Sequence, residues 1–266
     1  MDEERFQRVA VMPRSVSQVS QYLDRCAYAY YLLRIKRVVP RPAAWSIQGT
    51  AFHGAIEAYE LGGRRLGAEA VADLYSRDYA AAVNRELAKE PSLERWMTAG
   101  PDGASDIEAR YIHGRAQAAA YVHWAKDHGP KLWKDAEGRP GVELHVRAEI
   151  GGVQVQGYID QLPEEPDGSV RIRDLKTGST RSRFQLETYA VLVRKALGLV
   201  ATKGDWYMAK KNGLSRTVDL TKLSDDEVGT RFAQMDAGVK RGEFPPNQGF
   251  GCRFCDVSHA CQFFLR

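Results

Sequence analysis

The segment from 142 to 177, VELHVRAEIGGVQVQGYIDQLPEEPDGSVRIRDLKT, predicts three consecutive β-strands. Apolar and polar residues alternate in Val142–Ile150 and Val153–Leu162, as expected of strands with one buried face. The Gly151-Gly152 pair between these two strands is typical of a two-residue hairpin turn. A third strand, Ser169–Leu175, follows the next turn. We therefore expect a three-stranded meander in the middle of the chain.

Helical periodicity dominates the sequence on both sides of this segment. Upstream, the apolar spacing predicts a helix over 16–34, a helix that begins after Gly49, and a helical region over 64–128 that ends at Gly129-Pro130. Downstream, it predicts a helix over 183–197, strands around 205–210 and over 215–220, a helix over 224–240 and an irregular tail over 242–266. This order indicates an α/β fold with a mixed central sheet flanked by helices. We expect one domain over 1–266, with a helical insertion at 61–140.

Composition and charge narrow the class of protein. With 266 residues, 44% of them hydrophobic and 27% charged, the chain is typical of a globular protein with its own core. It has no apolar run of membrane-spanning length, and the N-terminal MDEERFQRVAVMPRS does not resemble a secretory signal. We therefore expect a cytoplasmic protein with no membrane segment. The net charge of +4 permits binding to a polyanion without requiring it.

Two aspartates and a lysine are the first candidate site. Asp160 lies on the polar face of the second predicted strand, and Asp174 and Lys176 point the same way from the third. If these strands pair, the two carboxylates meet beside the ammonium group. Such carboxylates suit Mg²⁺ or Mn²⁺, and a neighbouring lysine can stabilise the charge that develops when a phosphodiester is attacked. Taken alone, Asp-x-Lys is more often an ordinary surface ion pair.

The residues around this group carry a family pattern. In chain order, the sequence contains Gly49-Thr-Ala-Phe-His53, Gly157-Tyr-Ile-Asp160, Asp174-Leu-Lys-Thr177 and Gln185-x-x-x-Tyr189. This pattern resembles the RecB-like branch of the PD-(D/E)XK nucleases, and it covers most of the chain except the helical region at 64–140. Gln161 stands where many relatives have arginine.

The resemblance implies a role for each matching residue. His53, Asp160 and Asp174 would ligate the catalytic metal ion, together with the backbone carbonyl of Leu175. Lys176 would assist the attacking water. Gln185 and Tyr189, one turn apart on the following helix, would hold Lys176 and the scissile phosphate. Glu143, on the preceding strand, also has a frequent acidic counterpart in the family, and its role there can be structural.

The four cysteines form a second candidate site. Cys252, Cys255 and Cys261 are close in sequence, and Cys26 lies far upstream. In a reducing compartment such thiols stay free or bind metal. Four thiolates suit a zinc ion or an iron–sulfur cluster, and three close cysteines with one distant cysteine are more usual for a cluster. The layout is similar to that of RecB-like nucleases related to AddB and to the CRISPR-associated Cas-four nucleases. This likeness implies a [4Fe–4S] cluster in the 242–266 tail, completed by Cys26.

The resemblance implies a Mg²⁺- or Mn²⁺-dependent deoxyribonuclease, an exonuclease acting 5′ to 3′ on single-stranded DNA in recombination, repair or CRISPR adaptation. The chain has no Gly-x-x-x-x-Gly-Lys-Ser/Thr motif, so a helicase partner would be a separate polypeptide, as would a CRISPR adaptation partner. Two alternatives are a weak or inactive nuclease fold that binds DNA and carries an iron–sulfur cluster, and an electron-transfer protein. The retained Asp174 and Lys176 disfavour both. The predicted helices at 64–128 would form a lid or arch, or simply cover the sheet.

Overall fold

A six-stranded mixed sheet forms the centre of the computed structural model, which describes residues 3–179 and 181–264. The strands are β1 (Val142–Ile150), β2 (Val153–Gln161), β3 (Val170–Lys176), β4 (Ala201–Met208), β5 (Gly213–Leu214) and β6 (Val218–Asp219). The order is β1-β2-β3-β4-β5, with β6 also paired to β4. Only β3 and β4 are parallel among the strands of the described residues. The predicted α/β class, meander and mixed sheet are therefore confirmed.

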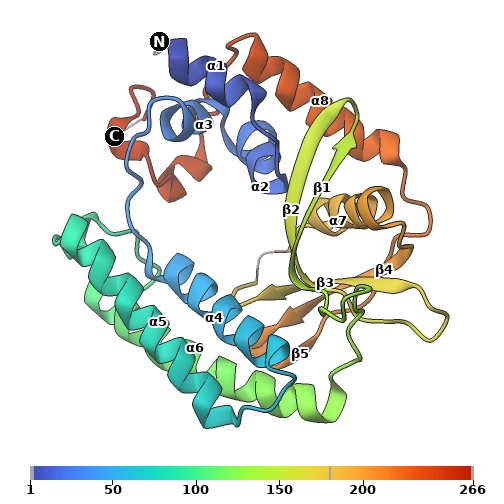
Figure 1. Cartoon of the computed structure of the whole chain (residues 1–266). Helices are drawn as coiled ribbons and strands as arrows, with labels where there is room; N and C mark the ends of the chain where they lie inside the picture. The colour runs from blue at the N-terminus through green and yellow to red at the C-terminus, as the bar shows by residue number, and fades with distance from the viewer. Residues whose placement is uncertain (1–2, 180, 265–266) are drawn as a thin grey trace.

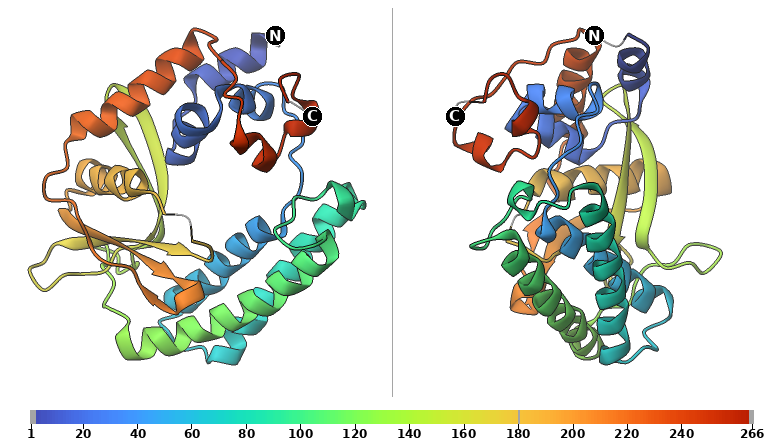
Figure 2. Two further views of the ribbon diagram at one scale, coloured as in Figure 1. Left: turned by 180° about the vertical axis from the view of Figure 1, so that it is seen from behind. Right: turned by 90° about the vertical axis from the view of Figure 1, so that its left-hand side faces the viewer.

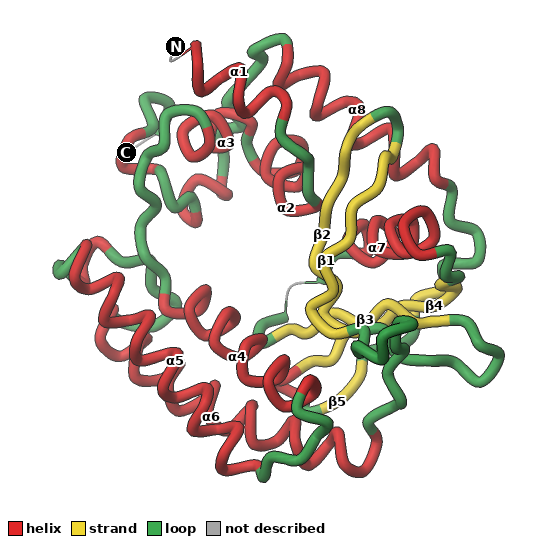
Figure 3. The backbone as a smooth tube through the Cα atoms, viewed as in Figure 1, coloured by secondary structure: helices red, strands yellow, loops and turns green. Residues whose placement is uncertain are grey.

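Helices cover both faces of this sheet (Figure 1, Figure 3). The helices are α1 (Glu3–Val11), α2 (Val16–Val19), α3 (Ala27–Arg34), α4 (Ala44–Leu61), α5 (Ala68–Lys89), α6 (Gly103–His128), α7 (Arg183–Leu197) and α8 (Asp225–Lys240). One core joins the sheet to α2, α7 and α8, and a second joins it to α4, α5 and α6. In β4, Trp206 belongs to the first core and Tyr207 to the second, because successive strand residues point to opposite faces. No helix of the described residues has both the length and the apolar character needed to cross a bilayer.

Local sequence signals explain where several of these elements begin and turn. Gly151 and Gly152 have φ values of +60° and +74°, the left-handed conformation that a two-residue hairpin turn requires. The Ser182 hydroxyl accepts a hydrogen bond from the Gln185 N–H at 3.3 Å, and so caps the start of α7. Gly198 ends α7 in the left-handed conformation, with φ +68°. The predicted bounds of this helix, 183–197, match the structure.

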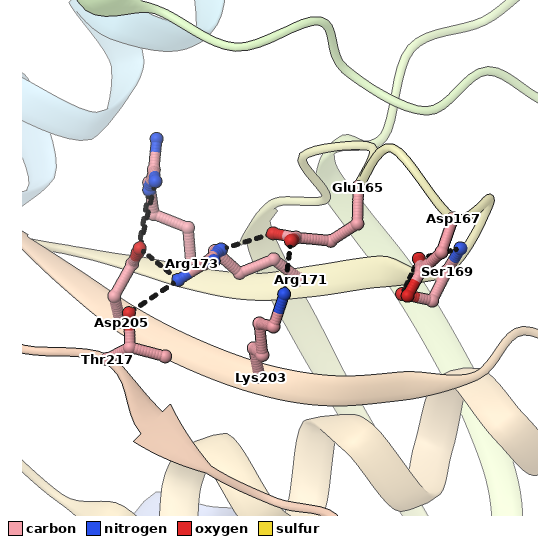
Figure 4. A network of polar contacts seen from close by, with 8 residues as sticks. All are labelled: Glu165, Asp167, Ser169, Arg171, Arg173, Lys203, Asp205 and Thr217. Atoms are coloured by element: carbon pink, nitrogen blue, oxygen red, sulfur yellow. Dashed lines mark hydrogen bonds and ion pairs between the residues drawn. The ribbon is translucent and has the colours of Figure 1, made fainter.

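A network of ion pairs braces β3 against β4 (Figure 4). Arg173 donates two hydrogen bonds to the carboxylate of Asp205, at 2.7 and 2.9 Å. Arg171 donates to the same carboxylate at 3.1 Å and to Glu165 at 2.7 Å. Lys203 donates to the other oxygen of Glu165 at 2.7 Å. Arg173 and Asp205 are only 2% and 1% exposed, so the structure holds these two charges in its interior by pairing them.

The single helix predicted over 16–34 is wrong. After α2 the chain forms a π-helical turn, Ser20–Arg25, and leaves the helix at Cys26, where φ is −164° and ψ is 115°. The C-terminal tail binds at this break. The backbone N–H of Asn247 donates to Cys26 Sγ at 3.4 Å, and its side-chain amide donates to the Arg25 carbonyl at 2.8 Å. Contacts from more than two hundred residues away therefore override the local periodicity.

Other boundaries also differ from the prediction. The second helix begins at Ala44 and not after Gly49, which lies inside α4. The strand expected around 205–210 is β4, which begins at Ala201 and is followed by a 3-10 turn at Ala209–Lys211. Helix α1 was not predicted. The tail is irregular as predicted, with short 3-10 turns at Phe250–Phe254 and Ser258–Ala260 in its described part, and it lies beside α3 (Figure 2).

Candidate metal centre

His53 projects from the middle of α4 toward the place where β1, β2 and β3 meet. Its Nδ1 atom lies 3.0 Å from the Glu143 carboxylate and 3.7 Å from the Asp160 carboxylate. Its Nε2 atom lies 3.1 Å from the backbone carbonyl oxygen of Leu175. Four groups from four different elements, one helix and three strands, thus converge on one point. The ligand atoms of His53, Glu143 and Asp160 lie within 4.8 Å of one another. Among the described residues, no other set of three histidine, cysteine, aspartate or glutamate side chains is as close together.

The sequence indicates that Glu143 matches a frequent acidic position of the family, but it does not predict a ligand role for this residue. It lies in β1 between Val142 and Leu144, which pair with Gln161 and Ile159, so Glu143 faces Asp160 across the ribbon. Its φ is +44°, the left-handed conformation that costs energy for a residue with a Cβ atom. The alternation of the strand gave no sign of this conformation.

Asp160 sits where β2 separates from β3. The two strands are registered at a single pair, Gln161 with Arg173. Beyond it, the Asp160 carboxylate accepts a hydrogen bond from the backbone N–H of Leu175 at 2.6 Å, where a regular ladder would have a backbone carbonyl. The side chain therefore fills the fork between the strands. Asp160 is 6% exposed. It is the buried last residue on the polar face of β2.

Asp174 begins a chain of polar contacts that reaches α7. The Lys176 ammonium lies 2.8 Å from one Asp174 carboxylate oxygen and donates to the other at 3.0 Å. Lys176 also donates to Gln185 Oε1 at 3.3 Å, and the Gln185 amide donates to the Tyr189 hydroxyl at 3.3 Å. The ring of Tyr189 packs behind Gly157, where an added Cβ atom would lie 2.7 Å from it. The predicted site residues of β3 and α7 are thus joined in one line.

The electrostatics of this group favour a bound cation. Burial, helped by the charges of Asp174 and Glu143, raises the pKa of Asp160 to about 7, against the lowering effects of His53 and of the hydrogen bond from the Leu175 N–H. Burial also raises the pKa of Asp174, against the lowering effect of Lys176. Burial alone would lower the pKa of His53, but the charges of Asp160, Glu143 and Asp174 outweigh it and raise that pKa to about 9. The acidic side chains Glu143, Asp160 and Asp174 thus share this place with the basic side chains of His53 and Lys176.

The donor set fits a hard divalent ion. Carboxylate and carbonyl oxygens with one imidazole nitrogen are ligands that Mg²⁺ and Mn²⁺ accept. One buried carboxylate oxygen of Asp174, Oδ2, has no hydrogen-bond donor with suitable geometry, although the Lys176 charge is close to it. Such an oxygen is available to a metal ion. Of the predicted ligands, His53, Asp160 and the Leu175 carbonyl converge with Glu143. Asp174 lies outside the group whose ligand atoms are within 4.8 Å of one another, and its charge acts on the pKa of His53 and of Asp160.

The four cysteines lie where the tail meets the break before α3. Cys26, Cys255 and Cys261 pack against a small apolar core of Ala29, Leu32 and Val257. Cys252 Sγ donates weakly to the Asn247 carbonyl at 4.0 Å. Burial raises the pKa of the Cys255 thiol, and charges on Asp256, Cys26 and Cys261 raise it further. Among the residues the structure describes, no three of these sulfur atoms lie within 4.8 Å of one another, so they do not form a compact group.

Comparisons with known proteins place these observations in a family. A family model described as the PD-(D/E)XK nuclease superfamily matches residues 13–262, a range that includes the metal centre and all four cysteines. The Gene 69 protein of Mycobacterium phage D29 is 38% identical over 262 residues, covering 94% of this chain and 97% of that protein. The Gene 69 protein of Mycobacterium phage L5 is 36% identical over 281 residues, covering 94% and 96%.

A solved structure shares the fold. A crystal structure of a protein from Eubacterium rectale that carries a provisional exonuclease name aligns with a TM-score of 0.51. It covers 100% of this chain and 94% of its own chain, at 12% identity. At this identity the likeness concerns the arrangement of helices and strands alone.

Proposed function

Because the chain belongs to the PD-(D/E)XK nuclease superfamily, we propose that it is a DNA nuclease that works with Mg²⁺ or Mn²⁺. The observation that supports this most directly is the convergence of His53, Glu143 and Asp160, whose ligand atoms lie within 4.8 Å of one another. Asp174, paired with Lys176, is close enough for its charge to act on the pKa of His53 and of Asp160. A family fold that had lost its activity would have no need to hold these charges together in its interior.

Each side chain has a part in this proposal. His53, Asp160, Asp174 and the Leu175 carbonyl would hold the ion, and Glu143 would hold it with them or orient His53. When bound, the ion would act as a Lewis acid and lower the pKa of water. Lys176 would place a positive charge beside the attacked phosphate, where negative charge grows. Gln185 keeps the Lys176 ammonium in place through its 3.3 Å contact.

Incubation with end-labelled DNA tests the proposal. We expect cleavage of single-stranded DNA in Mn²⁺ or Mg²⁺, no cleavage in EDTA, and none by the Asp174→Ala variant in either metal. Gel analysis of the labelled products measures the cleavage. Asp167→Ala, which changes an exposed aspartate in the turn before β3, is the matched control and should cleave normally. Cleavage that persists in Asp174→Ala would place the activity elsewhere and contradict the proposal.

We further propose that the enzyme is an exonuclease that degrades single strands from the 5′ end. The family resemblance of the motifs and the exonuclease name of the similar fold support this. Comparing 5′- and 3′-labelled substrates, and circular with linear single strands, measures the polarity and the need for an end. A role in recombination, repair or CRISPR adaptation, with a helicase or an adaptation protein as a separate partner, is part of the same proposal.

We also propose that Cys26, Cys252, Cys255 and Cys261 bind a [4Fe–4S] cluster. Three of these residues share one small core, and the fourth is tied to the same tail segment through Asn247. A single zinc ion, with Zn–S bonds of about 2.3 Å, would draw four sulfur atoms to within about 4 Å of one another. Among the described residues no three of these sulfur atoms lie within 4.8 Å of one another, so they are not drawn together in that way. Such a cluster would fasten the tail to α3.

The Cys255→Ser variant tests this cluster. Wild-type protein purified without oxygen should be brown and contain about four iron atoms per chain. The variant should lose the colour and most of the iron, and its thermal unfolding temperature should fall because the tail loses its anchor. Ser258→Ala, at a buried neighbouring position, should keep the colour. Wild-type protein that is colourless and holds zinc instead would contradict the assignment.

A further inference from the structure

The face of the β1–β2 ribbon that carries the metal centre continues past it as an exposed row of side chains. Glu143 and Asp160 face each other across the ribbon, and the next pair on the same face is His145 with Tyr158. The pair after that is Arg147 with Gln156. The opposite face of the ribbon is buried against α7, which lies on the other side of the ribbon from α4 (Figure 1).

An aromatic stack stands on this face, one step from the metal centre. The rings of His145 and Tyr158 are stacked, with centroids 4.6 Å apart and an interplanar angle of 18°. Tyr158 is nevertheless 56% exposed. His145 covers one side of the ring, and no other aromatic ring within the described residues contacts it. Burial or packing against the core therefore does not explain this side chain.

A positive charge lies next to the stack. Arg147 donates two hydrogen bonds to the Gln156 amide oxygen, at 3.0 and 2.8 Å, and His145 lies 3.4 Å from the same oxygen. Gln156 thus fixes the guanidinium and the imidazole in position without neutralising the charge of Arg147. A held cation beside an exposed aromatic ring is the combination that binds single-stranded nucleic acid, through the phosphate and the base respectively.

We propose that the His145–Tyr158 stack is a platform for a base of single-stranded DNA, one nucleotide away from the phosphate that is cleaved. Tyr158 is two residues from Asp160, roughly 7 Å along the strand, which is comparable with the length of one nucleotide. The base would continue the stack on the free side of Tyr158, and Arg147 would contact the next phosphate. Tyr158 is then a positioning residue, and its assignment rests on the proposed nuclease function.

Binding of fluorescein-labelled single-stranded DNA to the Asp174→Ala protein, which should not cleave it, tests the platform. Adding Tyr158→Leu should weaken binding about tenfold, which corresponds to about 1.4 kcal/mol and lies within the range for base–aromatic stacking. Tyr158→Phe should bind like the parent, because the ring is kept. Tyr111→Leu, which removes an exposed tyrosine of α6, is the matched control and should also bind like the parent.

Abasic substitution identifies the base. An abasic residue moved along the oligonucleotide should weaken binding to the parent at one position only, and Tyr158→Leu should cause no further loss with that substrate. Equal affinities of the Tyr158→Leu and parent proteins for intact DNA would overturn the platform, as would an equal loss on every abasic substrate. If the wild-type protein cleaves DNA while Tyr158→Leu binds normally, only the platform fails. If binding depends on Tyr158 but wild-type protein never cleaves, the nuclease proposal fails and the platform stands.

Discussion

Replacing Lys176 with Met is expected to slow DNA cleavage by about 10²–10³-fold, the usual effect of removing one preorganised electrostatic group from an active site. The Lys176 ammonium is held between Asp174 and Gln185, so its charge is fixed beside the place where the phosphate would lie. Methionine keeps most of the length of the side chain and removes only the charge. Single-turnover cleavage at saturating Mn²⁺ measures the rate.

Metal binding separates this effect from damage to the site. The carboxylate ligands remain in the Lys176→Met variant, so its affinity for Mn²⁺, measured by calorimetry, should be kept or increased. Lys211→Met, at an exposed position after β4, provides the control and should cleave like the wild type. A Lys176→Met protein that binds Mn²⁺ and cleaves as fast as the wild type would remove Lys176 from the mechanism.

Replacing Asp205 with Ala is expected to lower the free energy of unfolding by about 3–5 kcal/mol, because it leaves a buried charge without its partner. Arg173 is 2% exposed and directs two hydrogen bonds to this carboxylate (Figure 4). The ring of Trp124 also lies near Arg173, 5.4 Å from the guanidinium carbon, but it cannot replace a full negative charge. Urea unfolding followed by circular dichroism measures the change.

A double variant distinguishes a lost ion pair from a cavity. In Arg173→Met with Asp205→Leu, both charges are replaced by apolar side chains, and most of the stability lost in Asp205→Ala should return. The exposed Asp167, at the edge of the same network, should have little effect when changed to alanine. If the double variant were as unstable as Asp205→Ala, packing and not charge would account for the loss.

The central sheet could be predicted because its strands are specified locally. Alternation in β1 and β2, glycines at the hairpin turn and a serine cap on α7 all act within a few residues of the positions they determine. The interruption at Cys26 could not be predicted, because its cause is Asn247 in the tail. The pairing of Arg173 with Asp205 likewise depends on the parallel register of β3 and β4, which no local signal specifies.

The candidate site shows the same division. Strand periodicity predicts that Asp160, Asp174 and Lys176 lie on one side of the sheet. In the structure Lys176 pairs with Asp174, whose charge acts on the pKa of Asp160. The Glu143 carboxylate contacts His53 because Glu143 has a left-handed backbone conformation and because α4 passes over the β1–β2 ribbon at this point. Neither condition can be predicted from the residues next to Glu143. A single glutamate in an alternating strand is predicted to face solvent. Its contact with His53 depends on the position of α4 in the folded protein.

The attachment of the tail at Cys26 has a consequence for the order in which the molecule assembles. Tyr28 and Pro245 share a backbone hydrogen bond across more than two hundred residues of chain. Closing a loop of that size costs on the order of 5 kcal/mol in chain entropy, and while the ribosome is still making the last helix the docking segment does not yet exist. The second core, which joins the sheet to α4, α5 and α6, can form before the tail is made, whereas the cysteine region can form only once residues 245–261 are present. Premature termination before residue 245 would therefore remove none of the residues of the candidate metal centre, but it would leave α3 without the segment that packs against it.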